Sequence, residues 1–174
     1  MKKDRKFIRH ILLITAGIAV LLFGDQITKL LAVRYLANQE SILLIPGVLK
    51  LQYLENRGAA FGVLQNQQWI FMSIAFLFVL FAGYLFFHMP RTKRYLPLHI
   101  LLMLLVSGAV GNAVDRVFRG FVVDFIYFSL IDFPIFNVAD IYVVVSCILG
   151  FLFLMFYYKE DDFLFLKKGK GENP

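Results

Sequence analysis

Four apolar blocks, each close to the length of a membrane-crossing helix, constrain this chain more than any other feature of its sequence. They cover about residues 7–24, 69–88, 97–117 and 138–158. A helix needs about 20 apolar residues to cross the hydrocarbon core of a bilayer, and continuation toward Leu36 would lengthen the short first block. With 60% hydrophobic residues in 174, no water-soluble fold could bury so much apolar surface. The sequence therefore predicts an all-α membrane protein with four transmembrane helices, forming a single domain over residues 1–174.

Basic residues mark one side of the predicted bundle. They cluster before the first block, between the second and third blocks, and after the fourth block. Because cytoplasmic segments of membrane proteins are enriched in Lys and Arg, this pattern predicts that both termini are cytoplasmic. The connections 37–68 and 118–137 are then external. The net charge of +6 serves orientation and contact with lipid head groups, so we expect membrane lipid as a partner and no nucleic acid.

The basic start and the first apolar block also have the composition of a secretory signal peptide. No small-residue cleavage site follows, and the helical pattern continues through Asp25, Lys29 and Arg34, so we expect a retained first helix. The single cysteine, Cys147, is expected to be buried within the fourth helix, and no disulfide framework or zinc motif is present. We expect a disordered tail over about residues 166–174.

The first external connection has the pattern of a small β-hairpin. Pro46 and Gly47 give a turn signal, and the alternation over residues 49–53 predicts a strand that rests on the membrane. Directly after it, the stretch 56–62 contains two glycines and two alanines. Gly58 would let the backbone approach another group closely, and the Asn56 amide offers both donors and an acceptor. An ordinary tight turn is the alternative interpretation of this stretch.

Polar residues also gather at the external ends of the first and third helices. Asp25 and Lys29 are spaced i, i+4, which predicts either a stabilising ion pair or a support for a nearby site. Asn112, Asp115 and Arg116 share one face of the third helix, and an Asp115–Arg116 pair would keep the carboxylate ionised. A small-residue packing contact would explain Gly111 in that helix, but not the three polar groups.

Two further carboxylates, Asp124 and Asp140, suggest a specific chemistry. An aspartic peptidase uses two carboxyl groups that share one proton around a water molecule. Asp124 has bulky apolar neighbours that disfavour its ionised form, whereas Asp140 follows Asn137 at a helix N-terminus, where the dipole favours the ionised form. In the alternative interpretation Asn137 and Asp140 only cap the helix, and Asp124 is an ordinary loop carboxylate.

Other peptidase chemistries lack the residues they need. His10, His88 and His99 are scattered near the cytoplasmic side, there is no HExxH motif, and Ser107 has no basic partner. Asp132 is a weaker carboxylate candidate. A transporter would need polar residues along the whole depth of the bundle, but the middles of the second and fourth helices are almost wholly apolar. A non-catalytic scaffold would not need the polar clusters. We expect no metal and no cofactor.

Five segments in the same order and topology resemble the bacterial lipoprotein signal peptidases, also called signal peptidase II. They are Asp25-Gln26-x-Thr28-Lys29, Asn56-x-Gly58-Ala59-Ala60-Phe61, Gly111-Asn112-x-x-Asp115-Arg116, Gly120-x-Val122-Val123-Asp124-Phe125 and Phe133-Pro134-x-Phe136-Asn137-x-Ala139-Asp140. Each segment is short, but five of them in register over about 120 residues make a specific pattern.

The resemblance implies a four-helix aspartic endopeptidase of the bacterial inner membrane, with its site near the extracytoplasmic face. Such an enzyme removes the signal peptide of a diacylglyceryl-modified prolipoprotein, cutting immediately before the lipidated cysteine. Asp124 and Asp140 match the catalytic pair of the family. The remaining matched positions are binding or supporting residues, namely Asn56, Gly58, Asn112, Asp115, Arg116, Asn137, Asp25 and Lys29. A monomer is the default expectation.

Overall fold

The structure, a computed structural model, describes residues 2–58 and 64–166. Four long helices dominate this part of the chain, and all are long and apolar enough to cross a membrane, as predicted. They are α1 (Lys2–Leu36), α2 (Gln68–His88), α3 (Leu96–Arg119) and α4 (Val138–Phe156). The first helix continues beyond its apolar block to Leu36, as expected, so Asp25 and Lys29 lie within an unbroken helix.

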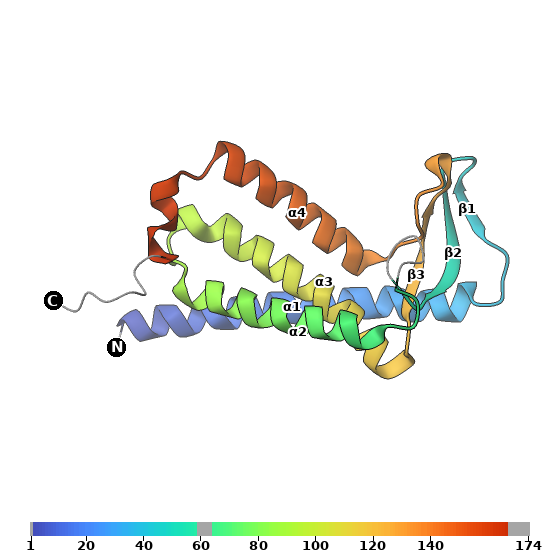
Figure 1. Cartoon of the computed structure of the whole chain (residues 1–174), viewed down its shortest axis with the longest axis horizontal. Helices are drawn as coiled ribbons and strands as arrows, with labels where there is room; N and C mark the ends of the chain where they lie inside the picture. Colours follow the sequence, from blue (N-terminus) through green and yellow to red (C-terminus); the bar gives the residue numbers. More distant parts are fainter. Residues whose placement is uncertain (1, 59–63, 167–174) are drawn as a thin grey trace.

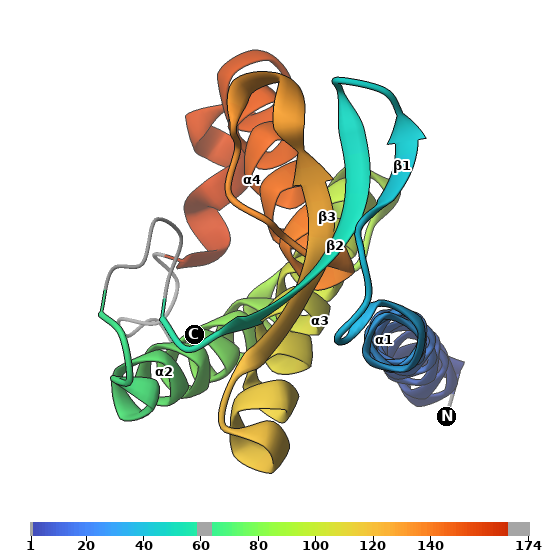
Figure 2. The ribbon, with the colours of Figure 1, turned by 90° about the vertical axis from the view of Figure 1, so that its right-hand side faces the viewer.

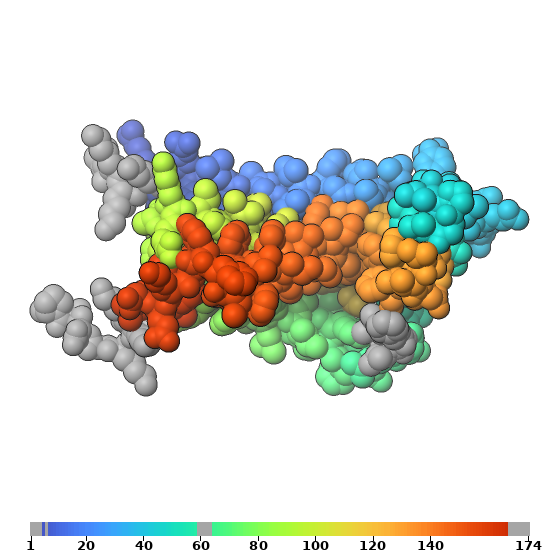
Figure 3. Space-filling view, turned by 90° about the horizontal axis from the view of Figure 1, so that it is seen from above, coloured from blue at the N-terminus to red at the C-terminus, as the bar shows by residue number. Residues whose placement is uncertain are grey.

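The helices lie side by side along the long axis of the molecule, and a small sheet stands across one end (Figure 1). The helix α3 is central, because α1, α2 and α4 all pack against it. Seen from above, α4 lies on the near face, with α1 on one side of it and α2 on the other (Figure 3). Gly108 allows α3 to approach α4 closely, since a Cβ atom there would lie 2.5 Å from the Ala139 carbonyl oxygen.

The sheet contains three antiparallel strands in the order β1-β2-β3. The strands β1 (Ile42–Ile45) and β2 (Leu49–Asn56) form the predicted hairpin around a turn at residues 46–48. The third strand, β3 (Val122–Phe128), pairs along β2, and the three strands cross the ends of the helices (Figure 2). This strand was not predicted. Its first four residues are all buried, so they lack the polar alternation of a one-sided strand.

Short 3₁₀ helices complete the described fold. They are η2 (Lys93–Tyr95), η3 (Ser129–Ile131) and η4 (Glu160–Leu166). At the end of the bundle away from the sheet, the Arg94 guanidinium donates two hydrogen bonds to the Asp162 carboxylate, at 2.6 and 2.8 Å. The segment η4 is therefore tied to the connection between α2 and α3. Except for Leu166, the predicted disordered tail lies outside the described residues.

The prediction for Cys147 was wrong, because this residue is exposed on α4. Its neighbour Ser146 is the buried residue, with its hydroxyl donating to the Tyr142 carbonyl at 2.6 Å. An apolar helix that borders lipid on one side exposes many apolar side chains, so hydrophobic character alone does not reveal which face packs inward.

Candidate active site

Asp124 and Asp140 line the same pocket, a cavity of about 450 Å³ at the sheet end of the bundle. Its polar lining consists of these two carboxylates together with Asn56, Gly58, Asn112 and Arg116. Its apolar lining comes from α2, from the start of α4 and from the segment before α4, namely Phe71, Ile141, Val144, Val145, Phe133, Pro134, Ile135 and Phe136, with Val122 from β3. The pocket thus combines a small polar centre with wide apolar walls, as in most sites for small ligands or side chains.

Asp124 is held on β3 by two side-chain amides. Its Oδ1 atom accepts a hydrogen bond from Asn137 Nδ2 at 2.6 Å, and its Oδ2 atom accepts one from Asn56 Nδ2 at 2.8 Å. Only 1% of the residue is exposed. Burial and the nearby negative charge of Asp140 raise the pKa of Asp124 to about 7, although the two amide hydrogen bonds act in the opposite direction. The predicted effect of its apolar surroundings is therefore confirmed.

Asp140 occupies the first turn of α4, where Asn137 is the N-cap residue. The Asn137 side chain accepts a hydrogen bond from the Asp140 N–H group at 3.1 Å, and Asp140 Oδ2 accepts one from the Asn137 N–H group at 3.1 Å. The capping interpretation is thus confirmed. It does not exclude a second role, because Asp140 also lines the pocket and its Oδ1 atom accepts a hydrogen bond from Asn112 Nδ2 at 2.8 Å.

The three amides around the carboxylates each have one possible orientation. The Asn56 oxygen accepts the Gly58 N–H group at 2.9 Å, and the Asn137 oxygen is used in the cap. The Asn112 oxygen accepts hydrogen bonds from the Lys29 ammonium at 2.8 Å and from Asn137 Nδ2 at 3.2 Å. Because ammonium and backbone N–H groups can only donate, each amide oxygen is used as an acceptor, and each amide must turn its NH₂ group toward a carboxylate.

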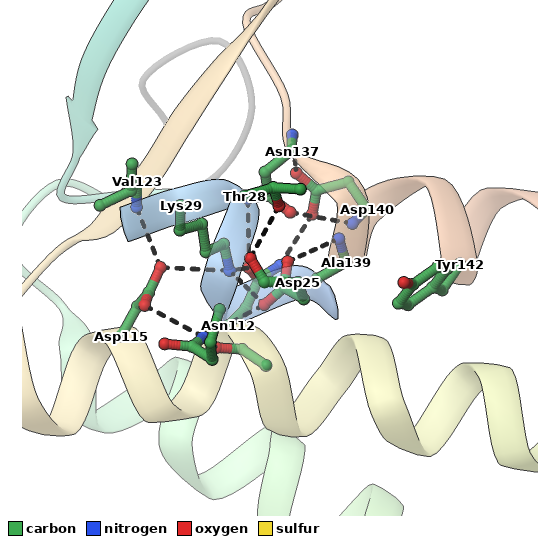
Figure 4. A network of polar contacts seen from close by, with 12 residues as sticks. Asp25, Thr28, Lys29, Asn112, Asp115, Val123, Asn137, Ala139, Asp140 and Tyr142 are labelled. Atoms are coloured by element: carbon green, nitrogen blue, oxygen red, sulfur yellow. Dashed lines mark hydrogen bonds and ion pairs between the residues drawn. The ribbon is translucent and has the colours of Figure 1, made fainter. Parts of the chain in front are cut away.

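A buried cluster of charges supports this network from α1 (Figure 4). The Lys29 ammonium lies 2.9 Å from Asp25 and 3.1 Å from Asp115, and all three side chains are fully buried. The predicted i, i+4 ion pair is therefore confirmed. Asp25 also accepts a hydrogen bond from the Ala139 N–H group at 3.0 Å, and Asp115 accepts one from the Val123 N–H group at 3.1 Å. The cluster thus holds the residues that immediately precede Asp140 and Asp124.

Asp115 does not form the pair with Arg116 that the sequence analysis considered. Asp115 instead pairs with Lys29 and with Arg119, one helical turn further along α3. Residues one position apart on a helix point in different directions, whereas residues four apart share a face. Arg116 points into the pocket, where its guanidinium donates to the Gly58 carbonyl at 3.2 Å and lies 4.5 Å from the centre of the Phe71 ring.

Sequence reasoning missed several residues that contact the site. Arg119 could have been found from its i+4 spacing to Asp115. Gln26 donates hydrogen bonds to Asp25 and Asp115, at 3.1 and 3.3 Å. No local pattern indicates that Phe71, which lies far along the chain, reaches the pocket. Residues 59–63, which belong to one of the matched segments, lie outside the described residues.

Other candidate chemistries find little support in the described part of the chain. Asp132 contacts the Tyr127 hydroxyl and does not line the pocket. The Ser107 hydroxyl donates to the Met103 carbonyl at 2.7 Å. Among the described residues, no group of three or more His, Cys, Asp or Glu side chains is arranged to hold a metal ion.

Comparisons with known proteins point to one family. The model of a family described as signal peptidase (SPase) II matches residues 17–156. A lipoprotein signal peptidase of Clostridioides difficile (strain 630) is 40% identical over 141 residues, which cover 80% of this chain and 93% of the relative. A lipoprotein signal peptidase of Streptococcus pyogenes serotype M1 is 38% identical over 161 residues, which cover 92% of this chain and 98% of the relative.

Two solved structures, both described as bacterial membrane enzymes studied by the in meso method, have the same fold. One, at 2.3 Å resolution, has a TM-score of 0.71 and 28% sequence identity. The match covers 93% of this chain and 94% of the chain in that structure. The other, at 1.9 Å resolution, has a TM-score of 0.72 and 30% sequence identity. This match covers 84% of this chain and 94% of the chain in that structure.

Proposed function

This chain belongs to the signal peptidase II family, and we propose that Asp124 and Asp140 are the two carboxylates with which it cleaves prolipoproteins. It is a multi-pass membrane enzyme of the aspartic peptidase class that removes the signal peptides of prolipoproteins. The observation that carries the proposal is the shared pocket, in which every carboxylate oxygen of the pair accepts an N–H hydrogen bond.

In this mechanism the two carboxylates have different protonation states. Asp124 is the neutral partner, because burial and the charge of Asp140 raise its pKa to about 7. Asp140 is the ionised partner, because it lies at the N-terminus of α4 and accepts two N–H hydrogen bonds there. Asp140 takes a proton from the attacking water as Asp124 donates a hydrogen bond to the scissile carbonyl oxygen. Asn112 and Asn137 keep both carboxyl groups in position.

The pocket lining suits a lipid-modified substrate. Phe71 and Ile141 are among the apolar side chains that α2 and α4 contribute, and Arg116 can donate hydrogen bonds to substrate carbonyl oxygens. Each buried methylene of a lipid contributes about 0.8 kcal/mol, so a diacylglyceryl cysteine stays in the leaflet. An enzyme that cuts immediately before this cysteine must carry its site at the membrane boundary, and the substrate approaches by lateral diffusion.

The same proposal includes an orientation. The basic residues at the end of the bundle away from the sheet favour cytoplasmic termini and an extracytoplasmic site in the bacterial inner membrane. The connected cluster of α1, α3, α4 and β3 completes the polar site within one chain, so a monomer is sufficient for activity.

Asparagine substitutions test the catalytic pair. We expect Asp124→Asn and Asp140→Asn each to lower the turnover of a diacylglyceryl-modified precursor by about 10²- to 10⁴-fold, since each removes one proton-transfer group. The matched control is Asp132→Asn, which changes a nearby carboxyl group outside the pocket and should leave turnover close to normal. Circular dichroism and thermal unfolding establish that the variants are folded. Near-normal turnover by either pair variant would refute its assignment.

A further inference from the structure

A second cavity lies at the other end of the bundle, between α1, α2 and α3. It has a volume of about 230 Å³, roughly half that of the catalytic pocket. Its walls are largely aliphatic and aromatic side chains, namely Ile11, Ile14, Ile18, Val79, Phe86 and Leu102. Gly83 leaves room on the α2 side, because a Cβ atom there would meet nothing within 4 Å. We call this cavity the lower groove.

Two histidines that the sequence analysis expected to be scattered meet beside the lower groove. The ring centroids of His10 and His99 are 4.6 Å apart in an edge-to-face arrangement, and the centroid of the Phe86 ring lies 5.5 Å from each of them. His99, which lines the groove, is only 1% exposed. Its Nδ1 atom lies 2.9 Å from the Tyr95 carbonyl oxygen, but its buried Nε2 atom has no hydrogen-bond partner among the described residues. The same holds for Nε2 of His10.

An unpaired polar atom at this depth is costly, and ionisable side chains inside a membrane bundle commonly mark functional sites. The chemistry of the missing partner follows from the tautomer. A carbonyl oxygen only accepts hydrogen bonds, so the proton of His99 is on Nδ1, and Nε2 of the neutral ring is an acceptor. The partner must therefore donate a hydrogen bond, as a hydroxyl group does.

A positive charge at this end of the bundle indicates that the ligand also carries a negative charge. Arg91 is exposed beyond the end of α2 and lies 4.2 Å over the ring of Phe7, one turn of α1 before His10. A guanidinium in this position attracts an anionic head group, and basic pockets between transmembrane helices commonly bind anionic lipids. Apolar walls, an acceptor nitrogen and a nearby cation together match a lipid rather than a soluble metabolite.

We propose that the lower groove binds an anionic phospholipid, whose head-group hydroxyl donates to His99 and one of whose acyl chains lies along α2. Phosphatidylglycerol has this chemistry, with a phosphate for Arg91 and glycerol hydroxyls for the histidine pair. Phosphatidylcholine lacks both the hydroxyls and the net negative charge. This site is separate from the catalytic pair and does not depend on its assignment.

Native mass spectrometry of the purified full chain tests the site. The enzyme in detergent is titrated with phosphatidylglycerol or with phosphatidylcholine of the same acyl composition. We expect one molecule of phosphatidylglycerol to be retained with about tenfold higher affinity than phosphatidylcholine. His99→Phe keeps an aromatic ring and removes both nitrogens, so it should lower this preference while the contribution of Arg91 remains, because one buried hydrogen bond is worth up to about a tenfold change in affinity.

Two further variants make the test specific. His88→Phe is the matched control, since this exposed histidine bonds to the Tyr84 carbonyl outside the groove and its loss should leave the preference unchanged. Gly83→Leu should fill the groove and displace both lipids. Precursor cleavage by each variant shows that it is folded. Equal retention of the two lipids by the unmodified enzyme, or an unchanged preference in His99→Phe, would overturn the proposal.

Discussion

Replacing Asn56 with alanine should move the alkaline limit of catalysis to higher pH. Asp124 must be protonated for the proposed mechanism, so activity is present below its pKa and is lost as the pH rises through it. With Asn56 in place that pKa is about 7. The Asn56 amide donates to Asp124 at 2.8 Å and lowers the pKa, because the hydrogen bond stabilises the ionised form more than the neutral form.

The size of the shift follows from this one hydrogen bond. A hydrogen bond to a charged group contributes about 1.5–3 kcal/mol, and one between neutral groups contributes about 0.5–1.5 kcal/mol. The difference of about 1–1.5 kcal/mol corresponds to about one pKa unit. Without the Asn56 amide, half of the activity should therefore be lost near about pH 8 instead of about pH 7.

The assay is the pH dependence of kcat/KM, which reports the ionisation of the free enzyme. A diacylglyceryl-modified precursor in mixed micelles is cleaved across the pH range, with each curve scaled to its own maximum. Asn56 also lines the pocket, so its loss can lower activity at every pH. Scaling removes this general loss from the comparison. Glu55→Gln is the matched control, because Glu55 is exposed on the same strand and pairs with Arg57. An alkaline limit in Asn56→Ala that stays in place or moves to lower pH would refute the reasoning.

Three further substitutions test the frame around the site. Lys29→Met should lower the free energy of unfolding by about 3–5 kcal/mol, because it leaves the buried Asp25 carboxylate without a cation and Asp115 with Arg119 alone, and unchanged unfolding in detergent would contradict this role. Gly108→Val should reduce stability by about 1–3 kcal/mol and slow cleavage, since it forces α3 away from α4, whereas Gly83→Val should be tolerated in the same assays. Asp162→Asn should make η4 more sensitive to limited proteolysis, because it weakens the double hydrogen bond with Arg94, and equal cleavage rates would count against that tie.

Much of the helical frame could be predicted because its signals are local. Membrane-crossing helices are recognisable from length and composition, and the hairpin from its turn residues and alternation. The Asp25–Lys29 pair and the Asn137–Asp140 cap were predictable for the same reason, since each involves residues three or four positions apart on one helix.

The features that escaped prediction depend on partners distant in the chain. The strand β3 is covered on both faces, so its sequence resembles any short apolar segment. Asn112 was a candidate site residue, but its orientation depends on Lys29, which lies 83 positions away. The partner of Arg116 could not be read from the sequence, because neighbouring residues on a helix diverge and only the packed bundle decides which of two arginines meets Asp115.

The buried cluster around Lys29 has a consequence for how the protein is made. The first helix enters the bilayer before the third has been synthesised, and at that stage Asp25 and Lys29 have only each other. Asn112 and Asp115, which complete their surroundings, arrive with α3. A nascent chain that stops earlier keeps these costly polar groups without their partners, so the sheet end of the bundle is stable only in the finished chain.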